Sequence, residues 1–191
     1  MTSRRRHRVK KQAAPATHEE VIRSRIHSPG CSWVYTDECT QGLEEIRAED
    51  DLACELLEAL PRRAERFGVP AEENNEHDDP HHPSHRCPVG GRVPDLPGYD
   101  FNELRPMPWT GEVYAESSDG ERLYRMYFIE RRAGWRAPTD MIVGCGTGQK
   151  PVREDTTWCS DDQTEDMHSA MKSGVTYCTN VTAKWRRWNT A

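Results

Sequence analysis

YRMYFIERRAGWRAPTDMIVGCGTGQKP, residues 124 to 151, is the stretch that decides the fold. It holds an aromatic and aliphatic run, a polar turn, and a second apolar run that ends in glycines and Lys150. Runs of this kind between turn residues predict strands. The preceding sequence GEVYAESSDGERL adds another strand and a turn at Asp119-Gly120. We therefore expect an antiparallel sheet of three to four strands.

Side chains in the strongest of these strands alternate between two faces. One face carries Tyr124, Met126 and Phe128, which we expect to pack on helices. The other face carries Arg125 and Tyr127, which we expect to be open to solvent. A cation beside an aromatic ring suits phosphate neutralisation and base stacking in single-stranded RNA. The alternative is an ordinary arginine on a half-solvated sheet.

The glycine-rich end of the stretch does not fit a nucleotide-binding loop. A Walker loop needs a glycine directly before its lysine, but Gln149 precedes Lys150 and Pro151 follows it. The dinucleotide pattern fails as well, because its third glycine comes too early and no long helix is indicated directly afterwards. We therefore expect no bound nucleotide.

A strand and a helical hairpin precede the sheet. Residues 31–38, CSWVYTDE, predict the strand. Between about Thr40 and Gly68, apolar residues recur at i, i+3 and i+4, which predicts two helices with acidic outer faces. Asp50 or Asp51 is placed to cap the second helix, and Pro61 is expected to kink or divide it. The fold class that follows is α+β.

The chain divides into three parts. Residues 1–30 are basic without periodicity and predict a flexible tail. Residues 31–153 form the expected α+β domain, in which residues 69–98 are a Pro- and His-rich insertion. Residues 154–191 form a C-terminal extension with one weak helix candidate near residues 161–173.

The 191-residue chain is hydrophilic, with 30% charged residues, a formal net charge of -6 and a mean hydropathy of -0.93. Its apolar runs are shorter than the roughly 18 residues of a membrane span, and no hydrophobic segment follows the N-terminal arginines. The seven cysteines are odd in number and form no CxxC pair, which favours reduced thiols. We expect a cytoplasmic protein without membrane association.

Residue spacing supports no cofactor or metal. The densest group of ligand-type side chains lies in one proline-rich loop with no partner pair elsewhere, which favours a polar surface insertion over a zinc site. Its members are His77, His81, His82, His85 and Cys87. No Ser/His/Asp or Cys/His arrangement for nucleophilic catalysis can be located.

The order of elements in residues 31–153 resembles the RelE/ParE superfamily of bacterial toxins. A first strand with a tryptophan precedes a helical hairpin ending in EALPRRAERFG, and a YRxxF strand precedes an apolar strand that ends in Gly and Lys. The resemblance implies the toxin of a type II toxin-antitoxin system of bacterial or phage origin, neutralised by a cognate antitoxin. Members like RelE cleave messenger RNA on the ribosome, and members like ParE inhibit DNA gyrase.

For the ribonuclease branch, the resemblance implies a metal-independent endonuclease in which a ribose 2′-hydroxyl attacks the adjacent phosphate. Arg125 then stabilises the phosphate, and Lys150 has a similar or an acid role. Arg105 is a weaker catalytic candidate, and Tyr127 is expected to stack a base. The remaining candidates for RNA contact are Arg131, Arg132 and Arg153.

The chain also departs from this family. It adds a basic tail, a histidine-rich insertion and a C-terminal extension, and it has no clear counterpart of the C-terminal tyrosine that some RelE-like nucleases use. Its acidic hairpin would repel ribosomal RNA unless it points away or meets a basic partner. The alternative function is a non-catalytic α+β protein-binding module of phage or mobile-element origin, whose sheet contacts a protein partner.

Overall fold

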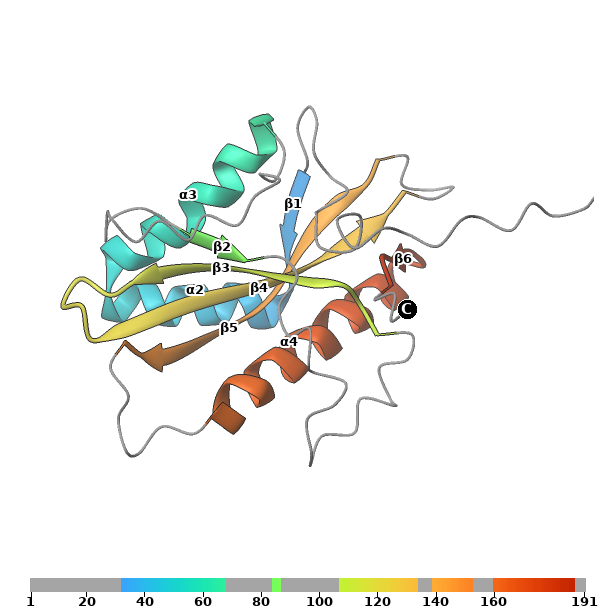
Figure 1. The fold of residues 1–191 in the computed structure, drawn as a ribbon. Coiled ribbons are helices and arrows are strands. Elements are labelled where there is room, and N and C mark those ends of the chain that lie inside the picture. Colours follow the sequence, from blue (N-terminus) through green and yellow to red (C-terminus); the bar gives the residue numbers. More distant parts are fainter. Residues whose placement is uncertain (1–31, 68–83, 87–106, 134–138, 153–159, 188–191) are drawn as a thin grey trace, which may run out of the picture.

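The computed structural model describes residues 32–67, 84–86, 107–133, 139–152 and 160–187 (Figure 1). Three helices and six strands lie in these ranges. In chain order they are β1 (Ser32–Tyr35), α2 (Asp37–Glu49), α3 (Asp51–Phe67), β2 (Ser84–Arg86), β3 (Thr110–Glu116), β4 (Arg122–Arg132), β5 (Met141–Pro151), α4 (Ser160–Asn180) and β6 (Lys184–Trp185). The predicted α+β class is confirmed.

The strands form one mixed sheet in the order β1-β5-β4-β3-β2, and β6 pairs with β4 off this path. β3, β4 and β5 are antiparallel neighbours, as the sequence predicts. β1 joins β5 in parallel, so the N-terminal strand lies beside the last long strand. The short strand β2, which lies within the predicted insertion, pairs with β3.

The turn between β3 and β4 is the predicted one at Asp119-Gly120. Gly120 has a φ of 73°, a conformation that glycine adopts without a steric penalty. The Ser117 backbone N–H donates to the Arg122 carbonyl at 2.8 Å, and the Ser117 hydroxyl donates to Asp119 at 2.6 Å. These bonds fix the register of the two strands.

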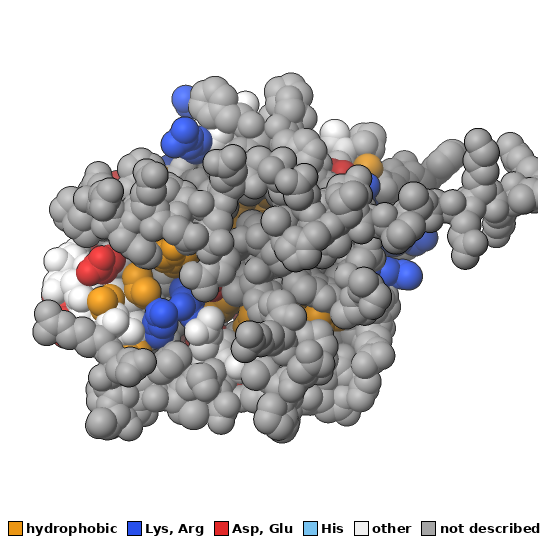
Figure 2. Space-filling view, viewed as in Figure 1, with side chains coloured by type: hydrophobic (Ala, Val, Ile, Leu, Met, Phe, Trp, Pro, Cys, Tyr) orange, Lys and Arg blue, Asp and Glu red, His pale blue; other side chains and the backbone are white. Residues whose placement is uncertain are grey.

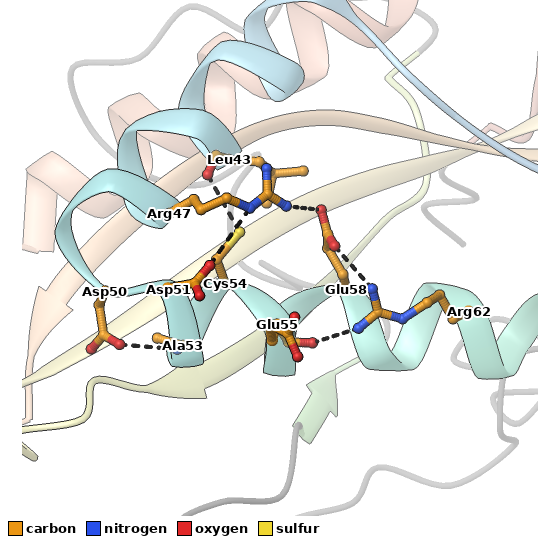
Figure 3. Close-up of polar contacts among 9 residues, drawn as sticks. All are labelled: Leu43, Arg47, Asp50, Asp51, Ala53, Cys54, Glu55, Glu58 and Arg62. Atoms are coloured by element: carbon orange, nitrogen blue, oxygen red, sulfur yellow. Dashed lines mark hydrogen bonds and ion pairs between the residues drawn. The ribbon is translucent and has the colours of Figure 1, made fainter.

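Asp50 joins the two hairpin helices to this turn. It ends α2, and its carboxylate accepts from the Ala53 N–H at 3.0 Å, so it caps α3 as predicted (Figure 3). The same carboxylate accepts from the Ser118 N–H and hydroxyl, both at 2.6 Å. Across the hairpin, Arg47 of α2 contacts Glu58 of α3 at 2.6 Å (Figure 3). The hairpin and the β3–β4 turn are therefore tied together.

Of the two outcomes expected at Pro61, division of the second helix is wrong, because α3 runs unbroken from Asp51 to Phe67; a kink stays a prediction. Proline removes one backbone hydrogen bond inside a helix. Leu57 before it and Ala64 after it are both fully buried in the core beneath α3. Apolar burial on both sides of the proline therefore keeps the two halves on the sheet.

Two hydrophobic clusters lie on opposite faces of the sheet. The cluster under α2 and α3 includes Leu43 and Leu57 together with Tyr124, Met126 and Phe128 of β4, so the predicted packing of these three residues on the hairpin is confirmed. α4 lies along β5 on the other face (Figure 1), and the cluster beneath it is made of residues from β4, β5 and α4. Its buried members are Tyr127, Ile129, Val143, Cys145, Met167, Ala170, Met171 and Cys178.

The expectation that the second face of β4 is open to solvent is wrong. Arg125 is 4% exposed and Tyr127 is 0% exposed. The cause is α4, which is longer than the helix predicted near residues 161–173 and packs on β4 and β5. Much of its sheet-facing stripe consists of small residues such as Ala170 and Gly174, which give a weak hydrophobic pattern in the sequence.

Gly42 provides a test of how closely α2 packs on the sheet. A Cβ atom at residue 42 would overlap the hydroxyl of Thr147 in β5. Alanine in place of a helical glycine normally stabilises by roughly 0.5–1 kcal/mol. We expect Gly42→Ala to destabilise by about 1–3 kcal/mol instead, because α2 must move off the strand.

Urea unfolding measures this change as a lower midpoint at an unchanged m value. The control is Gly42→Ala combined with Thr147→Ala, which removes the clashing hydroxyl and should recover part of the loss. A Gly42→Ala variant more stable than the wild type would contradict the close packing.

Candidate functional site beneath helix α4

The strand register brings four polar side chains together on the α4 side of the sheet. Arg125 of β4 lies opposite Tyr114 of β3, and Tyr127 lies opposite Glu112. Cross-strand partners share a face, and so do residues two apart in a strand. Asp166 of α4 meets the same face beside Arg125. We call Glu112, Tyr114, Arg125, Tyr127 and Asp166 together the Arg125 cluster.

The centre of the cluster is a buried ion pair. Arg125 Nε lies 3.7 Å from Glu112 Oε2, and the two side chains are 5% and 1% exposed. The Nε and Nη1 atoms of Arg125 make no hydrogen bond with the described residues. A buried pair with such geometry adds little net stability, although removing one partner is costly because a charge then stays buried alone.

Asp166 rests on the strand because residue 148 has no side chain. A Cβ atom at Gly148 would overlap the Asp166 carboxyl group, and Gly148 lies opposite Arg125 in the register. Burial raises the pKa of Asp166, and the nearby acidic groups of Asp162 and Glu165 raise it further. A hydrogen bond from the backbone of Gln149 and the charge of Arg125 act in the opposite direction.

Tyr127 is a phenol that keeps its proton. Burial raises its pKa well above the usual range, the Glu112 carboxylate adds to this effect, and Arg125 opposes it. A phenol of this kind donates a hydrogen bond and does not act as a base near neutral pH. Within the cluster, Glu112 and Asp166 are therefore the groups that can accept a proton.

The remaining predicted residues separate along the sheet. Lys150 lies opposite Leu123, on the same face as Arg125, and is half-buried. In Figure 2, Lys and Arg atoms lie beside apolar atoms in the left half of the view, where Figure 1 draws β4 and β5. Arg105 and Arg153 lie outside the described residues.

Arg131 and Arg132 lie at the far end of β4 from Arg125. Six residues of extended strand span about 20 Å. Arg131 is buried beside β6, where it pairs with Trp185 in the register. Arg132 is half-exposed and contacts Asp140 at 3.1 Å. The predicted basic residues therefore do not form one continuous surface.

A second buried ion pair fastens the C-terminal segment to the sheet. Arg186 Nη1 lies 3.3 Å from Glu130 Oε1, and the guanidinium lies over the Trp109 ring at 4.1 Å. The Arg186 N–H donates to the Glu130 carbonyl, and its own carbonyl accepts from Trp109 N–H. These contacts join the residue after β6 to β4 and to the residue before β3, and we assign them a structural role.

Glu112 and Asp166 were missed by the sequence analysis. Glu112 stands in a strand that the sequence predicts, but the residue opposite it depends on the register. Asp166 is one of four acidic residues in α4, and nothing in the spacing distinguishes it.

The described cysteines do not provide a nucleophile. Cys39, Cys54, Cys145 and Cys178 are free and buried. Burial raises the pKa of all four thiols, to about 12 for Cys39 and about 11 for Cys178. Since the thiolate is the reactive form, these buried thiols are poor nucleophiles.

No group of three or more His, Cys, Asp or Glu residues that suits a metal ion occurs in the part of the chain that the structure describes. Most of the histidine-rich group lies outside that part, namely His77, His81, His82 and Cys87. For His85 only the backbone, in β2, is described.

Comparison with known proteins gave no relative. No family model matches the chain, and no curated protein or solved structure matches it. The resemblance to the RelE/ParE superfamily therefore stays a prediction that rests on the quoted motifs and the order of elements.

The Glu112–Arg125 pair gives a stability test. Arg125→Ala leaves the Glu112 carboxylate buried without its cation, and we expect a loss of about 3–5 kcal/mol in the free energy of unfolding. Replacing both partners, as Arg125→Met with Glu112→Leu, should restore most of the wild-type stability.

Denaturant unfolding of the single and double variants measures this difference. Arg132→Ala, which breaks the partly exposed pair with Asp140, serves as the control and should cost less than about 1 kcal/mol. A double variant as unstable as Arg125→Ala would show that the pair is not the unit we describe.

Proposed function

We propose that this chain is a non-catalytic α+β protein-binding module. The observation that carries the proposal is the burial of Arg125 and Tyr127 beneath α4. An RNA phosphate or base can be bound only by groups that it can reach. α4 occupies the face on which the ribonuclease hypothesis depends.

The exposed helices support a partner of basic character. α2 carries five acidic residues against one arginine, and α4 carries four against one lysine. Glu44 and Glu45 of α2 are both exposed. Such surfaces repel the polyanionic backbone of RNA and attract basic protein segments, in a manner that salt weakens. We place this interaction in the cytoplasm. In the part of the chain that the structure describes, no helix is long and apolar enough to cross a membrane.

One observation favours a second candidate, the messenger RNA endonuclease of a toxin-antitoxin system. Glu112 lies beside Arg125, and Lys150 is on the same face of the sheet. In this candidate Glu112 takes the proton of the 2′-hydroxyl, whose oxygen bonds to phosphorus. Arg125 stabilises the phosphorane, and Lys150 gives a proton to the departing 5′-oxygen.

This second candidate has further requirements. Its partners are the ribosome with its messenger RNA and a cognate antitoxin. α4 must leave the sheet before RNA can reach Arg125, since the Arg125 side chain is 5% exposed. Removal of α4 would leave apolar residues such as Ile129 and Val143 uncovered. This cost is the reason that we rank the endonuclease below the binding module.

Induced expression in bacteria separates the two candidates. The module predicts normal growth and intact messenger RNA for the wild type. The endonuclease predicts growth arrest with ribosome-dependent cleavage, which Glu112→Gln and Lys150→Ala abolish. Lys150→Ala is informative because this half-buried residue lies at the end of β5, where its loss should leave the fold intact. Codon-phased cleavage lost in both variants would overturn the module proposal.

The charge of the partner is tested by binding in solution. We expect a lysine- and arginine-rich peptide to bind the wild type at low salt and to dissociate as salt is added. Glu44→Lys with Glu45→Lys should weaken this binding at least about tenfold, by reversing two exposed charges. Fluorescence anisotropy of labelled peptide measures the effect, and an acidic peptide and single-stranded RNA are the controls. Tighter binding of RNA than of the basic peptide would contradict the proposal.

A further inference from the structure

α4 meets the sheet in two different ways along its length. From its middle onward it contributes Ala170, Met171 and Cys178 to the apolar cluster on β4 and β5, and Met167 of its N-terminal half belongs to the same cluster. Closer to its N-terminus the contact includes the Asp166 carboxyl group on Gly148. The N-terminal half is therefore held partly by a titratable group, whereas the C-terminal half is held by apolar burial.

Charged and titratable groups surround Asp166 on every element packed near it. On α4, Asp162 and Glu165 are exposed and repel a carboxylate at residue 166. On β4, Arg125 attracts it, but Arg125 is already paired with Glu112 of β3. The other titratable groups that the described residues place on this face include Tyr114 of β3, Tyr127 of β4 and Lys150 of β5. Two carboxyl groups thus share one guanidinium.

We propose that Asp166 is a pH-sensitive clasp, which in its protonated form holds the N-terminal half of α4 on the sheet and in its ionised form loosens it. Asp166 lies beyond the first turn of α4, so ionisation gains little from the helix dipole there. The cost of ionising it against the strand is therefore not offset within the helix. This inference does not depend on the function proposed above.

The direction of the pH dependence follows from the raised pKa of Asp166. The docked helix binds the proton more tightly than the undocked helix. Docking is therefore strongest below the ordinary aspartate pKa of 3.8 and weakens as the pH rises through the higher pKa of the docked form. Loosening of α4 uncovers Arg125 and Tyr127, so pH controls access to the Arg125 cluster.

The pKa of Asp50 is shifted in the opposite direction to that of Asp166. Burial raises its pKa, but hydrogen bonds from Ser118 and Ala53 outweigh this and hold the pKa below the usual range. The contacts of Asp50 at the β3–β4 turn are therefore present above the unfolded pKa and are lost as the pH falls through the lowered one. Acid thus weakens the turn while it tightens α4, and a local measurement distinguishes the two effects.

Amide hydrogen exchange of the full chain tests the clasp. Protection factors of α4 residues 164–168, corrected for intrinsic exchange, should fall at least about threefold between about pH 4 and about pH 7. Asp166→Asn imitates the neutral carboxyl group and should keep high protection throughout. Glu121→Gln is the control, because this exposed carboxylate at the β3–β4 turn is not among the groups that shift the pKa of Asp166 and should leave the pH dependence in place.

Two results would overturn the proposal. One is a wild-type protection that does not change with pH, and the other is an equal change in Asp166→Asn. Should that variant fail to fold, a carbon-13 titration of the Asp166 carboxyl group in the wild type gives the answer directly. A pKa above the ordinary aspartate value supports the clasp, and an ordinary or lowered value refutes it.

Discussion

The contact between α4 and strands β4 and β5 buries the second face of the sheet, and the environment of the whole Arg125 cluster depends on it. Without this contact Arg125 and Tyr127 would lie on a half-solvated sheet, where an arginine is ordinary and a phenol titrates normally. With it, an ion pair and a carboxyl group are enclosed in a medium that penalises charge. The chemistry open to this face is therefore set by a helix that contributes only Asp166 to the cluster.

Small residues make this layering possible. The glycine-rich end of β5 superficially resembles a phosphate-binding loop. In the structure, glycines in this segment are positions against which α4 packs. Gly146 lies against Ala170, and Gly148 lies beneath Asp166. A helix that approaches a sheet over glycine brings its own backbone and short side chains close to the strand. These glycines therefore allow the close approach of α4 that encloses the Arg125 cluster.

The sequence was sufficient for features that depend on local periodicity. The alternation in β4 predicted that Tyr124, Met126 and Phe128 pack on the hairpin, and the helical stripe predicted the hairpin itself. The sequence was insufficient for features that depend on contacts between segments far apart in the chain. Small residues in α4 gave little sign that it covers the sheet, and the position of Glu112 beside Arg125 follows from a strand register that one strand alone does not reveal.

The measurement that tests the docking of α4 most directly is a methyl-resolved nuclear Overhauser experiment on the full chain. We expect cross-peaks between the methyl groups of Met167, Ala170 and Met171 on α4 and those of Ile129 and Val143 on the sheet, since all five residues belong to one buried cluster. Absence of these cross-peaks, while those between β3 and β4 persist, would contradict it. Arg125 and Tyr127 would then lie on an open face after all.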